Sequence, residues 1–113
     1  TQQDYDDMLE ELLDRFGEPG KAVLNLLAIA KLKAIAHQGY VTEIKQTGKI
    51  VRFTLYEKAR LNTEGFPALM QKYRRGLQFK NEQEPKFILE PQGNLILALT
   101  EFAEGLKSMA ENM

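Results

Sequence analysis

The chain has 113 residues, the length of one ordinary domain, and 43% of them are hydrophobic. A core of normal size can therefore form without disulfides or a metal. The absence of cysteine excludes both disulfides and a thiolate zinc site. The formal net charge of -1 argues against a dedicated nucleic-acid binder, which usually carries a clear basic excess. No apolar stretch approaches the ~20 residues of a membrane span, so we expect neither nucleic acid nor membrane as a direct partner.

The organisation of the chain predicts a single domain over residues 1–113. We find no internal repeat, no low-complexity tract and no linker long enough to separate domains. The chain opens with an acidic amphipathic stretch in place of a signal peptide, and with the absence of cysteine this favours a cytoplasmic protein. Because the first residue is Thr1 and not methionine, we expect a fragment of a longer protein or a processed chain.

The first predicted helix runs from about residue 5 to residue 16. Asp4 is the expected N-cap, and Gly17 supplies a stop at the C-terminal end. Apolar residues at helical spacing predict one buried face. These residues are Met8, Leu9, Leu12, Leu13 and Phe16.

A second helix is predicted from Pro19 to Gln38. Proline is favoured in a first turn, where its missing N–H costs nothing, and Gly39 ends the helix. Apolar residues between Val23 and Ile35 cover most of its circumference. Such a pattern predicts a central helix that packs on more than one side.

A β-hairpin follows, and its register can be predicted by pairing residues across the turn. A turn at Thr47-Gly48 places Glu43 opposite Arg52, an opposite-charge cross-strand pair. The same register places three further pairs on one face. These pairs are Ile44 with Val51, Thr42 with Phe53, and Tyr40 with Leu55.

The rest of the chain predicts a helix, two short strands and a terminal helix. The helix spans Gly65 to Tyr73, and the strands span residues 77–80 and 86–90. The last helix spans residues 95–112, with Asn94 as its N-cap. The order is therefore ααββαββα, which predicts an α+β fold with a small antiparallel sheet packed by helices. The sequence leaves open whether the second pair of strands joins the first hairpin.

Few residues could carry chemistry. His37 is the only histidine and Ser108 the only serine, so a nucleophilic triad has few candidates. We expect His37 to be an exposed residue favoured by the C-terminal end of its helix; a general base in a small enzyme is the alternative. No phosphate-binding glycine motif occurs, and no cofactor is expected. The basic cluster at residues 72–75 is a weak candidate for contact with single-stranded nucleic acid. Its aromatic residue, Tyr73, falls on an apolar stripe and is expected to be buried.

A resemblance covers about residues 9 to 39. The run Glu11-Leu12-Leu13-Asp14-Arg15-Phe16-Gly17 has the form E-L-x-D-R-F-G, and Pro19 and an apolar helix from Val23 to Lys33 follow it. This segment resembles the opening of the C-terminal domain of bacterial transcription-repair coupling factors. Gly20 departs from the family pattern, which usually has a larger residue there.

The resemblance implies a non-catalytic C-terminal regulatory domain of a larger, multidomain ATP-dependent DNA translocase. That parent acts on stalled RNA polymerase and recruits nucleotide-excision repair. The domain is expected to pack on the N-terminal UvrB-like module of the parent. It would thereby mask the surface that binds UvrA and restrain the motor.

The resemblance also implies that Glu11, Asp14 and Arg15 form the interdomain interface. Their spacing of i, i+3 and i+4 places them on one helix face, away from the leucines. The competing interpretation is an ordinary solvated pair between Glu11 and Arg15, worth about 0.2–0.5 kcal/mol. A stand-alone adaptor that binds a partner through an apolar strip on the last helix is the second functional hypothesis.

Overall fold

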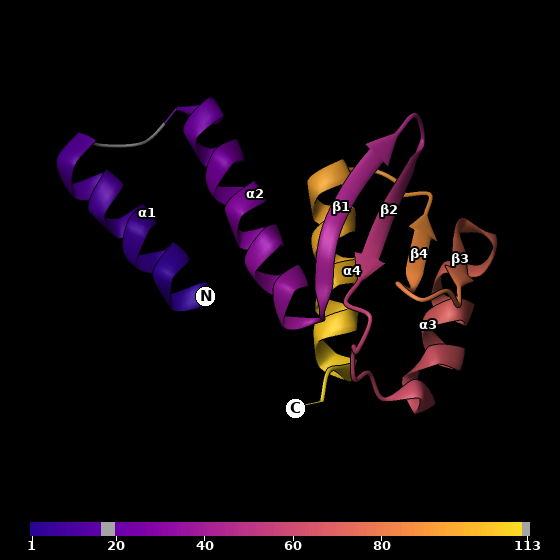
Figure 1. The fold of residues 1–113 in the computed structure, drawn as a ribbon. Coiled ribbons are helices and arrows are strands. Elements are labelled where there is room, and N and C mark those ends of the chain that lie inside the picture. The colour runs from indigo at the N-terminus through magenta and orange to yellow at the C-terminus, as the bar shows by residue number, and fades with distance from the viewer. Residues whose placement is uncertain (17–19, 112–113) are drawn as a thin grey trace.

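The fold is a four-stranded antiparallel sheet with helices packed on one face (Figure 1). The computed structural model describes residues 1–16 and 20–111, with side chains of residues 12–16 excepted. The helices are α1 (Gln2–Phe16), α2 (Lys21–Gln38), α3 (Phe66–Tyr73) and α4 (Leu95–Met109). The strands are β1 (Val41–Thr47), β2 (Ile50–Leu55), β3 (Leu77–Lys80) and β4 (Lys86–Leu89). The predicted α+β class and the element order ααββαββα are confirmed.

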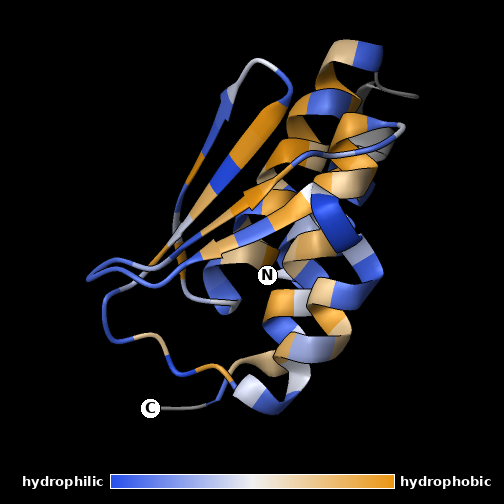
Figure 2. Ribbon diagram, turned by 90° about the vertical axis from the view of Figure 1, so that its right-hand side faces the viewer, coloured by the Kyte–Doolittle hydropathy of each residue, from blue (hydrophilic) through white to orange (hydrophobic). Residues whose placement is uncertain are grey.

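The two hairpins form one sheet, which settles the point that the sequence left open. The strand order is β1-β2-β4-β3, because β4 pairs with β2 as well as with β3. Figure 2 shows the strands on one side and the helices on the other. An antiparallel sheet of this kind can bury one face and leave the opposite face to solvent.

The core lies between the two central strands and α4. Phe53 of β2, Phe87 of β4 and Phe102 of α4 are fully buried. The ring centroid of Phe102 lies 4.8 Å from that of Phe53 and 5.4 Å from that of Phe87, in tilted and edge-to-face arrangements that aromatic rings favour. Tyr73 of α3 also packs edge-on against Phe102, at 5.5 Å. One side chain of α4 therefore joins both central strands and α3.

The predicted hairpin register is wrong by two residues. The turn is Gly48-Lys49, so Thr47 pairs with Ile50 and Ile44 pairs with Phe53. A shift of two residues keeps every side chain on its own face, so the hydrophobic pattern cannot separate the two registers. Turn geometry decides between them, because Gly48 adopts φ +60 at a position that a β-branched Thr47 would occupy only under strain.

The same shift changes the predicted charge pair. Glu43 lies opposite Thr54, and Arg52 lies opposite Lys45. Glu43 and Arg52 nevertheless form an ion pair across the diagonal, with 2.6 Å between Oε1 and Nη2.

The bounds of the first two helices differ from the prediction at their N-termini. Helix α1 begins at Gln2, and the Thr1 hydroxyl accepts a hydrogen bond from the Asp4 N–H, so Asp4 lies in the first turn and is not the N-cap. A hydrogen bond from the Thr1 side chain and the neighbouring Thr1 ammonium lower the pKa of the Asp4 carboxyl. Helix α2 begins at Lys21. Gly17 and Pro19 lie outside the described residues.

The later boundaries agree well with the sequence. The Asn94 side chain accepts a hydrogen bond from the Leu97 N–H at 3.0 Å, which confirms the predicted N-cap of α4. Helix α4 ends at Met109, earlier than predicted, because the following residues pair with the segment before α3. The Asn62 N–H donates to the Met109 carbonyl, and the Glu111 N–H donates to the Arg60 carbonyl, each at 2.7 Å.

Helices α2 and α4 meet closely at Gly39, the residue that ends α2. A Cβ atom added at Gly39 would lie 2.9 Å from the Leu106 Cβ and 3.0 Å from the Lys107 backbone nitrogen. The next residue, Tyr40, adopts φ +68, and its carbonyl accepts a hydrogen bond from the Tyr56 N–H at 2.8 Å. The glycine therefore permits the close helix approach, and Tyr40 makes the sharp turn into β1.

Gly39→Ala should lower the free energy of unfolding by about 1–3 kcal/mol, because the new methyl group meets backbone that cannot easily move. The measurement is urea denaturation of the 113-residue chain. Gly20→Ala is the matched control, since nothing lies within 4 Å of a Cβ there, and it should change stability by less than about 1 kcal/mol. Equal effects of the two substitutions would contradict this account of the α2–α4 contact.

Candidate interaction surfaces

Helix α1 packs antiparallel against α2 and forms an arm on the side of α2 away from the sheet (Figure 1). Tyr5 and Leu9 are half-buried, and the Lys31 ammonium of α2 lies 5.4 Å from the Tyr5 ring centroid. At the start of α1, Gln2 donates a hydrogen bond to Asp6 and Gln3 donates one to Asp7. Local partners therefore already engage these two carboxylates.

The predicted interface residues belong to this arm. Glu11 is exposed on α1. Asp14 and Arg15 lie within the last turns of α1, but their side chains fall outside the described part of the structure, as do those of Leu12, Leu13 and Phe16. The predicted clustering of Glu11, Asp14 and Arg15 on one exposed face therefore remains a prediction.

The N-terminal half of α2 exposes apolar side chains that the sequence analysis expected to be buried. Leu27, Leu32, Ile35 and Ala36 are buried, whereas Val23, Leu24 and Leu26 are exposed, with Leu26 67% exposed. The prediction that α2 packs on several sides is correct only for its C-terminal half. The first turns of α2 diverge from the sheet, and α1 is the neighbouring element there (Figure 1).

The exposed Leu26 lies at about the same height along the arm as Glu11. The antiparallel packing that sets Tyr5 beside Lys31 sets Glu11 level with Asn25 and Leu26, because both helices rise equally per residue. Met8 of α1 is also exposed, at 48%. We call Met8, Glu11, Val23, Leu24 and Leu26 the arm surface. It combines apolar area with charge, the composition of a protein-binding surface.

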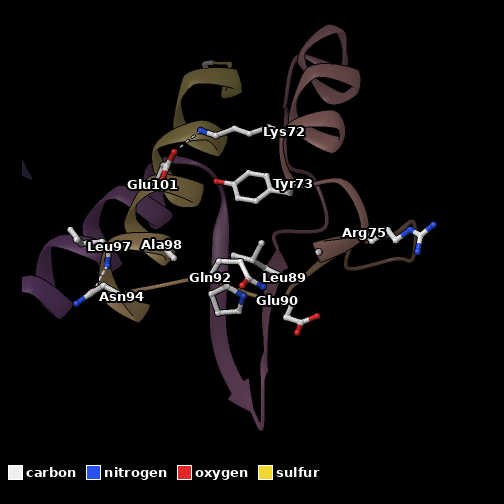
Figure 3. Close-up of a pocket in the computed structure, with 12 residues that line it drawn as sticks. Lys72, Tyr73, Arg75, Leu89, Glu90, Gln92, Asn94, Leu97, Ala98 and Glu101 are labelled. Carbon is white, nitrogen blue, oxygen red and sulfur yellow. Dashed lines mark hydrogen bonds and ion pairs between the residues drawn. The ribbon is translucent and has the colours of Figure 1, made fainter.

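A second feature is a groove of about 590 Å³ between α3, α4 and the loop that precedes α4 (Figure 3). Lys72 and Glu101 form an ion pair across it, with 2.7 Å between Nζ and Oε1. The hydrogen bond to Glu101 raises the pKa of Lys72, so its ammonium stays protonated and is a poor general base. Figure 3 shows the Arg75 side chain extending away from this ion pair.

The groove has an apolar side as well. Leu97 of α4 is 70% exposed beside it, and Pro91 is half-buried in its lining. Leu97 is the large hydrophobic residue that α4 exposes; Leu99, Phe102, Leu106 and Met109 are buried. The apolar strip that the adaptor hypothesis requires on this helix is therefore not present in the described structure.

The residues considered for chemistry lie apart from one another. His37 is exposed near the end of α2, beside an open depression of about 260 Å³, and Ser108 donates its hydroxyl hydrogen bond to the Gly105 carbonyl. Among the side chains that the structure describes within residues 1–16 and 20–111, no three metal-ligating groups cluster together. Over the same ranges, no helix has the length and apolar character needed to cross a membrane.

Comparison with known proteins identifies the family. The fold and its exposed arm define a small α+β domain suited to contacts with other protein modules. The model of the TRCF domain family matches residues 1–66, more than half of the chain. The chain belongs to the TRCF domain family, the family of transcription-repair coupling factors, which confirms the resemblance predicted from the sequence.

Two known proteins illustrate the match. The transcription-repair-coupling factor of Bacillus subtilis (strain 168) is 35% identical over 65 residues, which cover 58% of this chain and 6% of that protein. The chain thus spans a small fraction of that relative. A crystal structure of the C-terminal domain of transcription-repair coupling factor has the same fold, with a TM-score of 0.72 and 22% identity over 96% of this chain and 72% of the other.

Tyr73 offers a test of the packing behind the groove. Burial raises the pKa of the Tyr73 hydroxyl, with a smaller contribution from the nearby Glu101 carboxylate. Because its folded pKa lies above the unfolded value, the stability it contributes is complete below about pH 10 and is lost as the pH rises through the folded pKa. Tyr73→Phe should therefore weaken the fall in unfolding free energy above about pH 10.

The measurement is thermal or urea unfolding of the chain across that alkaline range. Tyr56→Phe is the control, because Tyr56 is exposed in the segment after β2. Tyr73, which the sequence analysis expected to be buried, is half-buried against Phe102. The same alkaline slope in wild type and Tyr73→Phe would contradict this partial burial.

Proposed function

We propose that this domain is a non-catalytic regulatory module of a cytoplasmic transcription-repair coupling factor. It packs on the N-terminal UvrB-like module of its parent, masks the UvrA-binding surface and restrains the DNA translocase. The observation that carries the proposal is the family match over residues 1–66, which includes α1 and the charged segment around Glu11. The same segment forms an arm held mainly by α2, so it is accessible to another module.

The physical character of the arm surface supports this role. Exposed Leu24 and Leu26 offer apolar area for burial, and Glu11, Asp14 and Arg15 would orient the contact by charge complementarity. A stable protein interface buries about 800 Å² on each partner. A contact that buries less area than this is typical of transient interactions and suits a contact that must be released.

The proposal of a non-catalytic role rests on the same family match and on the ion pair in the groove between α3 and α4. Lys72 and Glu101 satisfy each other, so they are not available as an acid–base pair. The domain is proposed to affect RNA polymerase and UvrA indirectly, because it restrains the parent protein that interacts with them. Neither nucleic acid nor a cofactor has a role in this proposal.

The test replaces Glu11, Asp14 and Arg15 together by alanine in the full-length coupling factor. Release of the masked surface should increase the affinity of the coupling factor for UvrA. A coupling free energy of about 1–3 kcal/mol between the interdomain contact and UvrA binding corresponds to an increase of about 5- to 150-fold. The ATPase rate of the motor should rise in the same variant. UvrA affinity is measured by titration calorimetry or by fluorescence anisotropy.

A matched control is the triple alanine variant of Glu104, Lys107 and Glu111, which removes the same net charge from exposed positions at the other end of the domain. It should leave UvrA affinity unchanged. If the Glu11 triple variant keeps wild-type UvrA affinity while its circular dichroism spectrum shows an intact fold, the masking role is wrong.

A further inference from the structure

Strand β1 is a long edge strand whose outer side has no partner in the sheet. The strand order β1-β2-β4-β3 leaves β1 and β3 at the two edges. Strand β1 has seven residues and β3 has four. An edge strand presents a row of backbone donors and acceptors that can pair with another chain, and the longer strand presents the longer row.

The register identifies the backbone groups that face outward. Thr47 and Ile50 flank the two-residue turn, so they form a hydrogen-bonded pair. Hydrogen-bonded and non-hydrogen-bonded pairs alternate along an antiparallel ladder, so Lys45 with Arg52 is again a bonded pair. The N–H and C=O groups of Ile44 and Gln46 therefore point away from β2, toward the open edge.

A depression adjoins this edge on the helix side. Helix α2 and strand β1 diverge from the point where α2 ends (Figure 1). An open groove of about 260 Å³ lies between them, and exposed His37 and Glu43 are part of its lining. Ala36 and Val41 are buried and Ile44 is half-buried, so its floor is apolar. Lys33 is exposed in its lining. An extended chain laid along β1 could place alternate side chains against this floor.

The charges along β1 favour an acidic chain. Lys45 lies directly opposite Arg52, and like charges at such positions destabilise a sheet. Glu43 relieves only part of this repulsion, because it is already paired with Arg52 at 2.6 Å. A carboxylate beside Lys45 would relieve the remaining repulsion.

We propose that β1 binds an extended acidic segment of a partner protein, which adds a fifth strand to the sheet. Backbone hydrogen bonds to Ile44 and Gln46 supply affinity, and alternate side chains supply specificity. Apolar side chains of the segment pack on the floor of the groove, and its carboxylates lie on the opposite face of the sheet, beside Lys45. A second copy of β1 suits the edge less well, because its Lys45 and Arg52 outnumber its Glu43.

This surface is distinct from the arm surface, so the proposal does not depend on the masking role of Glu11, Asp14 and Arg15. The probe is a blocked seven-residue peptide that alternates glutamate with valine, titrated into the 113-residue chain and followed by amide chemical shifts. Saturable shifts should centre on Ile44 and Gln46. The peptide with lysine in place of glutamate should bind at least about tenfold more weakly.

Two peptide variants test strand addition itself. N-methylation of one alternate set of peptide nitrogens should abolish binding, because those N–H groups face β1. N-methylation of the other set should preserve binding, because those groups face outward. Equal effects of the two sets would overturn the proposal, and so would saturable shifts confined to other strands.

Protein variants test the charges and the edge. Lys45→Glu should weaken binding at least about tenfold, whereas Lys80→Glu on the opposite edge strand should not. Gln46→Pro removes an outward N–H and should abolish binding, whereas Gln46→Ala keeps that N–H and should bind normally. No peptide binding, unchanged binding by Lys45→Glu, or a β1-to-β1 dimer in sedimentation experiments would each contradict the proposal.

Discussion

The contact of Phe102 with both central strands is the constraint on which the rest of the structure depends. Its ring lies against Phe53 and Phe87, and the three side chains have no exposed surface. Because β2 and β4 are joined both by their ladder and by this ring, the two hairpins behave as one sheet. Helix α4 is thereby fixed across the sheet, and it becomes the platform on which α2 packs.

That platform holds only part of α2, and the exposed arm follows from this. The tight approach at Gly39 and the buried Leu32 and Ile35 anchor the C-terminal half of α2 beside α4. Its first turns diverge from the sheet with α1 as their neighbour, and Leu26 is left exposed. The same divergence of α2 from β1 opens the strand edge. One packing geometry therefore accounts for both candidate interaction surfaces.

Much of this fold follows from local sequence signals, and the failures have physical causes. The Asn94 cap located the start of α4 and Gly39 located the end of α2, since these signals act within one element. The hairpin register depended on turn geometry, because two registers that keep the same faces share the same hydrophobic pattern. The exposure of Leu26 could not be predicted. Apolar residues at helical spacing indicate a face that can be buried, but they do not show how far the neighbouring elements extend along α2. For the candidate site, the family motif located Glu11, but periodicity carried no information about the groove beside Lys72.

The central claim is that the sheet and α4 form a fixed body that presents the α1–α2 arm to another module of the parent protein. Hydrogen–deuterium exchange compares the 113-residue chain with the full-length coupling factor most directly. The account predicts slower exchange of α1 amides in the full-length protein and equal exchange in α4. Equal exchange of α1 in both proteins would contradict it.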